Sequence, residues 1–167
     1  GCFGFNGCSP FAANGDVVAA AFVTHISAAT ACVTWMIWER VHFGKASLIG
    51  IATGMVASLA SITPAAGHVG PMGALVIGGV AGILCQELIN VVKQNFSVDD
   101  SLDVFAVHGV GGIWGTLALP FLAATSRGGA GLAEGVSAIS QFVVQLAGVI
   151  GVAAFTVVMT VVLAMVA

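Results

Sequence analysis

The stretch SAISQFVVQLAGVIGVAAFTVVMTVVLAMVA, residues 137–167, contains no Asp, Glu, Lys or Arg. The hydrocarbon core of a bilayer is roughly 30 Å thick, and a helix of about 20 mainly apolar residues crosses it. A helix also satisfies its own backbone hydrogen bonds, for which lipid offers no partners. The stretch therefore predicts a membrane-spanning helix.

The rest of the chain has the same apolar character. Of the 167 residues, 59% are hydrophobic and 7% are charged, and the mean hydropathy is +1.10. A soluble domain is about 25% charged, because its surface faces water. The 23 glycines, with many Ala, Ser and Thr, are small residues that let helices approach closely within lipid. The composition predicts an all-α fold, a polytopic transmembrane helix bundle.

Polar and Gly-Pro connectors divide the chain into five predicted spans, preceded by the end of a sixth at residues 1–9. The five spans cover residues 12–38, 46–62, 70–92, 102–123 and 137–167. Residue 1 is Gly, and the first residues look like the tail of an apolar segment rather than a signal peptide. We therefore expect the chain to be a fragment of a longer protein.

The positive charges of the connectors predict the orientation in the membrane. If the spans alternate in direction, Arg40, Lys45 and Lys93 fall on one side, and Arg127 alone falls on the other. Connectors rich in Lys and Arg favour the cytoplasm. The C-terminus is then predicted to be cytoplasmic.

Several functions are disfavoured by what the sequence lacks. The formal net charge is −3, and no basic patch is available to neutralise nucleic-acid phosphates. No nucleophile and base pair, and no cluster of metal ligands, is apparent, so we expect neither an enzyme nor a metal or cofactor site. Cys2 and Cys8 lie near one membrane face, and they either form a disulfide or remain two free thiols.

Polar residues within a predicted span are the candidates for function. His108 lies in the Gly-rich span 102–123, and its imidazole either lines a path for a small hydrogen-bonding solute or is a packed, satisfied group. Asp103, at the start of that span, is expected to give structural support by capping free N–H groups. His25 either touches a pore or hydrogen-bonds a neighbouring helix. Asp100, with its neighbour Asp99, is interpreted as part of a polar loop.

The residues Asp103-Val-Phe-Ala-Val-His108-Gly-Val-Gly-Gly-Ile-Trp-Gly-Thr resemble the tenth-helix motif of the ammonium transporter (Amt) family. Further segments agree in order: GFNGCS at 4–9, ITPAAG at 62–67, GPMGAL at 70–75, and residues 141–148. The resemblance covers the whole chain. It implies the second half of an inverted-repeat ammonium transporter fold, with residues 1–167 forming a partial membrane domain of about five complete transmembrane helices plus the end of a sixth.

The resemblance also implies roles for particular residues. His108 matches the second of two pore histidines, Phe5 a phenyl ring that helps close the outer mouth, and Ser9 a hydroxyl that helps to hold ammonium. The implied function is transport of ammonium or ammonia through a hydrophobic pore, and the alternative is the ammonium-sensing membrane domain of a signalling protein. The family commonly has Trp at the position of Cys2 and Gly at that of Cys8.

The partners follow from the same resemblance. It implies ammonium, ammonia and methylammonium as solutes, and a homotrimer in the bilayer of the plasma or inner membrane. A PII-type regulator would act through a cytoplasmic tail that residues 1–167 do not contain.

Overall fold

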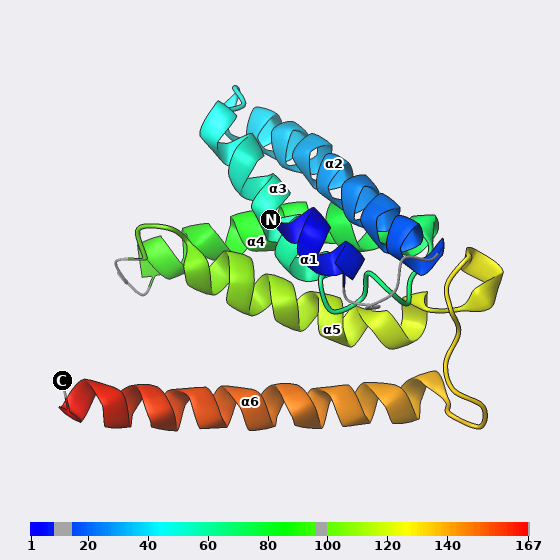
Figure 1. Cartoon of the computed structure of the whole chain (residues 1–167). Coiled ribbons are helices and arrows are strands. Elements are labelled where there is room, and N and C mark those ends of the chain that lie inside the picture. The colour runs from blue at the N-terminus through cyan, green and yellow to red at the C-terminus, as the bar shows by residue number, and fades with distance from the viewer. Residues whose placement is uncertain (9–14, 96–99, 167) are drawn as a thin grey trace.

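The computed structural model describes residues 1–8, 15–95 and 100–166, except for the side chains of Gln94, Asn95 and Arg127. The described residues form helices and no strand, which confirms the all-α prediction (Figure 1). In chain order the elements are α1 (Cys2–Cys8), α2 (Gly15–Phe43), α3 (Leu48–Ile62), α4 (Pro71–Asn95), the π-helical turn η1 (Phe105–Val110), α5 (Gly111–Leu122), the 3-10 turn η2 (Thr125–Arg127) and α6 (Ala138–Val166).

Four helices of the described chain are long and apolar enough to cross a membrane. They cover Gly15–Phe43, Pro71–Lys93, Phe105–Leu122 and Ala138–Val166. The remaining predicted span, at residues 46–62, forms α3. The 15 residues of α3 are fewer than the about 20 that a span requires. The helix starts late because Ser47 caps it, accepting a hydrogen bond from the Gly50 amide at 2.8 Å, and it ends before Pro64. That α3 crosses the bilayer stays a prediction.

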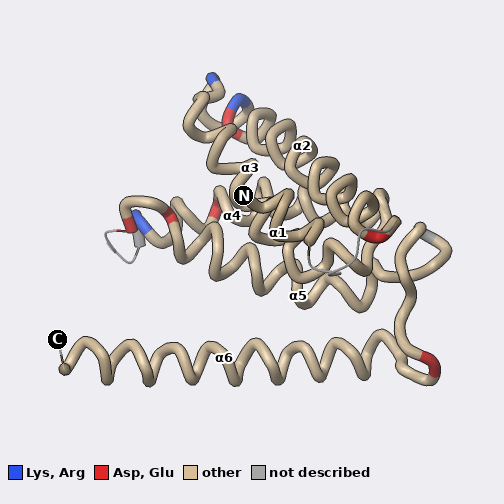
Figure 2. Tube along the Cα trace, viewed as in Figure 1, with Lys and Arg blue, Asp and Glu red and all other residues tan. Residues whose placement is uncertain are grey.

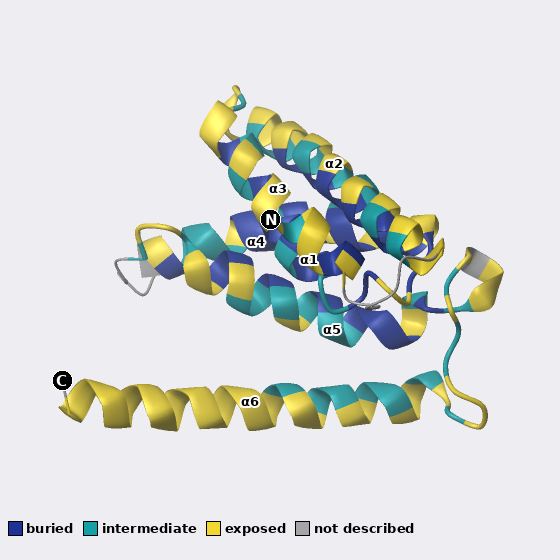
Figure 3. Cartoon of the chain, viewed as in Figure 1, coloured by how far each residue is buried: buried dark blue, intermediate teal, exposed yellow. Residues whose placement is uncertain are grey.

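The helices α2, α3 and α4 pack against one another, α5 lies along α3 and α4, and α1 lies against α2 (Figure 1). The buried surfaces face inward between these helices, as Figure 3 shows. Most of the buried apolar residues are alanines, with Val23, Trp35, Ile62 and Ile77 among the larger ones. Small residues at a helix contact bring backbones close together, so the packing follows the composition.

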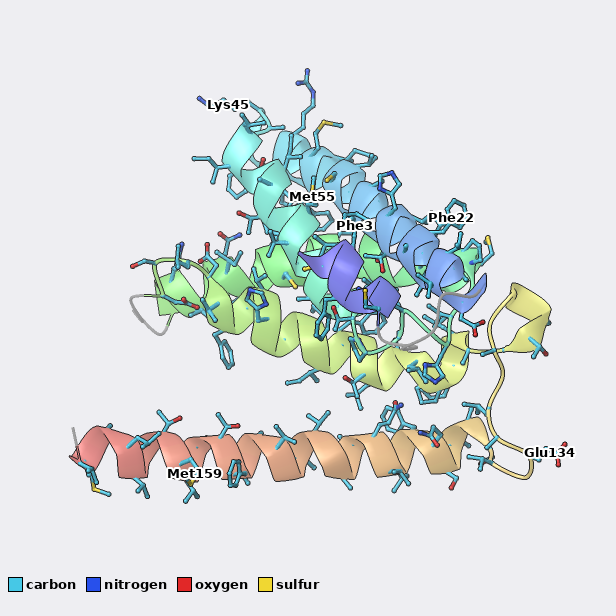
Figure 4. The ribbon with its side chains drawn as sticks, in the orientation of Figure 1. Phe3, Phe22, Lys45, Met55, Glu134 and Met159 are labelled. Atoms are coloured by element: carbon cyan, nitrogen blue, oxygen red, sulfur yellow. The ribbon has the colours of Figure 1, made fainter. Side chains whose placement is uncertain are left out.

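The helix α6 lies apart from the rest of the bundle and contains no buried residue (Figures 1 and 3). It meets α5 near its first turns, where the rings of Phe121 and Phe142 have centroids 5.6 Å apart. An apolar groove of about 480 Å³, lined by Trp114 and both phenylalanines among others, runs between these helices. Met159, labelled in Figure 4, belongs to the second half of α6, in which every described residue is exposed.

The described Asp, Glu, Lys and Arg residues lie toward helix ends and in connectors, leaving the middles of the spans uncharged (Figure 2). At the end where α2 and α4 finish, Trp38 Nε1 donates to Glu87 Oε1 at 2.6 Å, and the Ser47 amide donates to Glu39 Oε2 at 2.7 Å. These bonds join α2 to α4 and to the start of α3. This end is the one that the positive charges predict to be cytoplasmic.

Gly78 sets the closest approach between α2 and α4. A Cβ atom built on Gly78 would lie 2.9 Å from the carbonyl carbon and the Cα of Ser27, and closer still to its oxygen. The Ser27 hydroxyl is itself 2.7 Å from the hydroxyl of Ser58 on α3, within a hydrogen bond. One buried point thus holds three helices together.

We expect Gly78→Ala to destabilise the protein by about 1–3 kcal/mol, because the added methyl group has to displace backbone rather than a flexible side chain. The matched control is Gly79→Ala, whose Cβ would lie 3.7 Å and 3.8 Å from the methyl groups of Thr30 and Thr34, an ordinary contact. Thermal unfolding of both variants in detergent measures the difference. Equal midpoints would show that the contact at Gly78 does not limit the packing.

Candidate functional site

His108 lies in η1, where a π-helical turn leads directly into α5. Its side chain is exposed, and the described residues supply it with no hydrogen-bond partner. Within the described residues His108 is neither packed nor hydrogen-bonded, and the choice between a path-lining and a packed histidine stays a prediction. A neutral imidazole carries one donor and one acceptor, so His108 has both available for a solute or another chain segment. Single π-helical turns occur often at functional sites.

Two glycines that follow His108, Gly111 and Gly115, fix the C-terminal end of this turn against α3. A Cβ on Gly111 would lie 2.8 Å from Ser61 Oγ and 3.3 Å from the Ala57 carbonyl oxygen. A Cβ on Gly115 would overlap the Ser61 carbonyl group. Both positions are buried, and both require glycine for α5 to lie this close to α3. The turn that bears His108 thus ends at a tight helix contact.

Asp100, not Asp103, caps the start of the turn. Asp100 accepts hydrogen bonds from the Val104 amide at 3.0 Å and the Phe105 amide at 2.8 Å. Asp100 lies in the connector, as predicted, and also provides the capping hydrogen bonds that were expected from Asp103. That Asp103 gives structural support near a pore stays a prediction. Asp103 has a positive φ of 56°, and its carboxylate lies 2.7 Å from Lys93 Nζ instead. Three aspartates within residues 99–103 signal a cap, but sequence alone does not indicate which one provides it.

Asn6 holds α1, the helix that bears Phe5, against α2. Its Nδ2 donates to Thr24 Oγ1 at 3.1 Å, and Thr24 donates in turn to the Ala20 carbonyl at 2.7 Å. Asn6 is 2% exposed, whereas Phe5, one residue earlier, is 66% exposed. Asn6 and Thr24 were not among the site residues predicted from sequence, although an amide within an apolar segment signals an interhelical hydrogen bond.

The remaining candidate residues are Ser9, His25 and the two N-terminal cysteines. Ser9 lies outside the described residues. His25 is exposed, finds no hydrogen-bond partner in the described chain, and packs beside the ring of Phe3 at a centroid distance of 5.8 Å. Phe3 is labelled in Figure 4. All four cysteines are free, so Cys2 and Cys8 do not pair.

Comparison with known proteins identifies the fold. The profile of the Ammonium Transporter Family matches residues 1–167, the whole chain. This chain belongs to the ammonium transporter family. Ammonium transporter Amt1 of Archaeoglobus fulgidus is 44% identical over 166 residues, which cover 98% of this chain and 41% of Amt1. The ammonium transporter of Aquifex aeolicus is 38% identical over 167 residues, covering 99% of this chain and 39% of the relative.

Solved structures agree with this family assignment. The crystal structure of Saccharomyces cerevisiae Mep2 superimposes with a TM-score of 0.85 at 32% identity, over 97% of this chain and 40% of Mep2. A structure titled Sensor Amt Protein gives a TM-score of 0.81 at 32% identity, over 89% of this chain and 36% of that protein. The chain thus spans about two fifths of the length of its ammonium transporter relatives.

We expect Thr24→Val to destabilise the ammonium transporter domain by about 1–3 kcal/mol, because the buried Asn6 amide loses its acceptor. The other side-chain atom of Asn6, Oδ1, already has no partner among the described residues, so the amide has no second bond to compensate. Thr24→Ser keeps the hydroxyl and is the control. Thermal unfolding of the two purified variants decides the point, and equal stability would show that the bond does not hold α1.

Proposed function

We propose that this chain forms one wall of a pathway for ammonium or ammonia through a membrane-spanning transporter. The observation that carries the proposal is the family match along all 167 residues, including the motif around His108. An exposed imidazole without a partner, on a helix long and apolar enough to span, supports it. An ionisable group at membrane depth is costly unless it faces a cavity or another polar group.

In the proposed mechanism, the residues of this chain act in two places. Phe5 and Ser9 lie at the outer mouth, where the face of an aromatic ring attracts a cation and a hydroxyl accepts a hydrogen bond from ammonium. His108 lines the narrow path beyond and hydrogen-bonds the solute as ammonia, after the ammonium ion has transferred its proton to water near the mouth. Methylammonium follows the same route as a second solute.

The surroundings of the domain belong to the same proposal. The domain lies in the plasma or inner membrane with its C-terminus in the cytoplasm, because Arg40 and Lys93 lie in the last turns of α2 and α4, and Lys45 in the connector after α2, all on one side. The transporter is a homotrimer, and a PII-type protein regulates it from the cytoplasm. No catalytic step is assigned, since the relatives are named as transporters.

A sensor is the alternative function on the same fold, and the structure titled Sensor Amt Protein motivates it. The curated relatives are named ammonium transporters over almost the whole of this chain, so transport is the preferred proposal. The two functions differ in whether solute crosses the membrane.

We expect His108→Leu to reduce ammonium-driven current and methylammonium uptake by about tenfold or more, a loss of about 1.4 kcal/mol of barrier stabilisation. The leucine fills a similar volume but offers no hydrogen bond. The assay uses proteoliposomes that contain the full-length protein. His68→Leu is the matched control, because His68 is an exposed histidine in the turn after α3.

Two results would contradict the proposal. If His108→Leu folds and conducts as the wild type does, His108 does not line the path. If the wild type binds ammonium but passes neither current nor methylammonium, the sensor function replaces transport.

A further inference from the structure

The turn that bears His108 is attached to its neighbours at both ends, by contacts of different kinds. On the C-terminal side, a Cβ on Gly115 would overlap the Ser61 carbonyl group of α3, and one on Gly111 would lie 2.8 Å from Ser61 Oγ. On the N-terminal side, the contact is polar: Asp103 pairs with Lys93, which belongs to the last turn of α4. Between these contacts the chain forms a π-helical turn rather than a regular α-helical one.

We propose that the ion pair between Lys93 and Asp103 positions the π-helical turn and thereby sets the direction in which His108 faces. Lys93 and Asp103 are positioning residues in this proposal, since neither touches the solute. The effect on transport rests on the proposed function, whereas the effect on the orientation of His108 does not.

The backbone of Asp103 supports this role. A positive φ is unfavourable for a residue with a Cβ atom, and Asp tolerates it better than most. Such conformations persist where the surrounding structure holds them, and they cluster at functional sites. Two interactions hold the backbone conformation of Asp103. One is the ion pair with Lys93, and the other is the Asp100 carboxylate, which accepts hydrogen bonds from the amides of Val104 and Phe105.

The exposure of the two side chains argues that the pair is more than a solvated surface contact. The Asp103 side chain is 18% exposed and that of Lys93 is 45% exposed, with 2.7 Å between Nζ and Oδ1. A well-exposed ion pair contributes little because water screens it. Here the carboxylate is largely covered, so removal of the lysine leaves it without a counter-charge two residues before the turn.

The geometry connects this pair to His108. A π-helical turn closes its hydrogen bonds over one more residue than an α-helical turn, so it accommodates one additional residue between two fixed points. The contact of Gly111 with α3 is one fixed point, and the contact of Asp103 with α4 is the other. If the contact of Asp103 with Lys93 of α4 is lost, the turn can relax toward α-helical hydrogen bonding. This change rotates His108 about the helix axis.

The test compares four variants of the full-length protein: Lys93→Met, Lys93→Arg, Asp103→Asn and the double variant Lys93→Met with Asp103→Asn. Lys93→Met removes the cation without changing the backbone of Asp103. Asp103→Asn removes the anion but keeps a side chain that tolerates a positive φ. Lys45→Met is the matched control, since Lys45 lies at the tip of the connector between α2 and α3 and forms no ion pair with the described residues (Figure 4).

The first measurement is the ¹³C and ¹⁵N magnetic resonance signal of the His108 imidazole in lipid, assigned by its loss in His108→Leu. We expect Lys93→Met and Asp103→Asn to shift this signal alike, the double variant to add nothing further, and Lys93→Arg and Lys45→Met to leave it unchanged. Because this signal does not depend on flux, it tests the positioning even if the protein does not transport.

The second measurement is the turnover of methylammonium uptake. We expect the maximal rate of Lys93→Met to fall by about two- to fivefold, the range of a partly exposed ion pair. The half-saturation concentration should not change, because recruitment occurs at the mouth. An unchanged His108 signal in folded Lys93→Met, additive shifts in the double variant, or equal effects of Lys93→Met and Lys45→Met would each overturn the proposal. If Asp103→Asn fails to fold, the comparison of Lys93→Met with Lys93→Arg decides.

Discussion

The close contact of α2, α3 and α4 at small residues is the constraint on which the rest of the structure depends. Lipid provides no hydrophobic drive between helices, so their association relies on backbones that approach closely and on interhelical hydrogen bonds. Gly78 against Ser27, and the bond from Ser27 to Ser58, supply both kinds of interaction at one place. The positions of α1 and α5 follow, because each packs on a surface that these three helices create.

The candidate site is built on that bundle by contacts that differ in chemistry. Glycines determine how α5 lies on α3, and polar contacts determine how the turn before it begins. His108 lies between the two, with its side chain left uncovered by the described residues. The bundle therefore fixes the helix, while the imidazole stays available. Such separation of support from function is expected where a polar group must face a path through lipid.

Much of the fold was predictable from sequence, because apolar length and charged connectors report directly on the requirements of a bilayer. The all-α class was confirmed, and four of the five predicted spans form helices long and apolar enough to cross a membrane, whereas α3 begins only at Leu48 because Ser47 caps it. The family motif predicts a pore role for His108, which stays a prediction, but it does not predict the π-helical turn around this residue. The exchanged roles of Asp100 and Asp103 depend on a backbone angle and on a lysine in another helix, and neither is visible in local sequence.

The isolation of α6 has a consequence for how the protein is made. A helix enters the bilayer from the translocation machinery when its own residues favour lipid, or when earlier helices shelter its polar groups. The spans differ in this respect: α6 carries no charge and contains no buried residue, whereas the segment of η1 and α5 contains a histidine and several glycines. We infer that α6 inserts on its own during synthesis, while the histidine-bearing span relies on the helices that precede it.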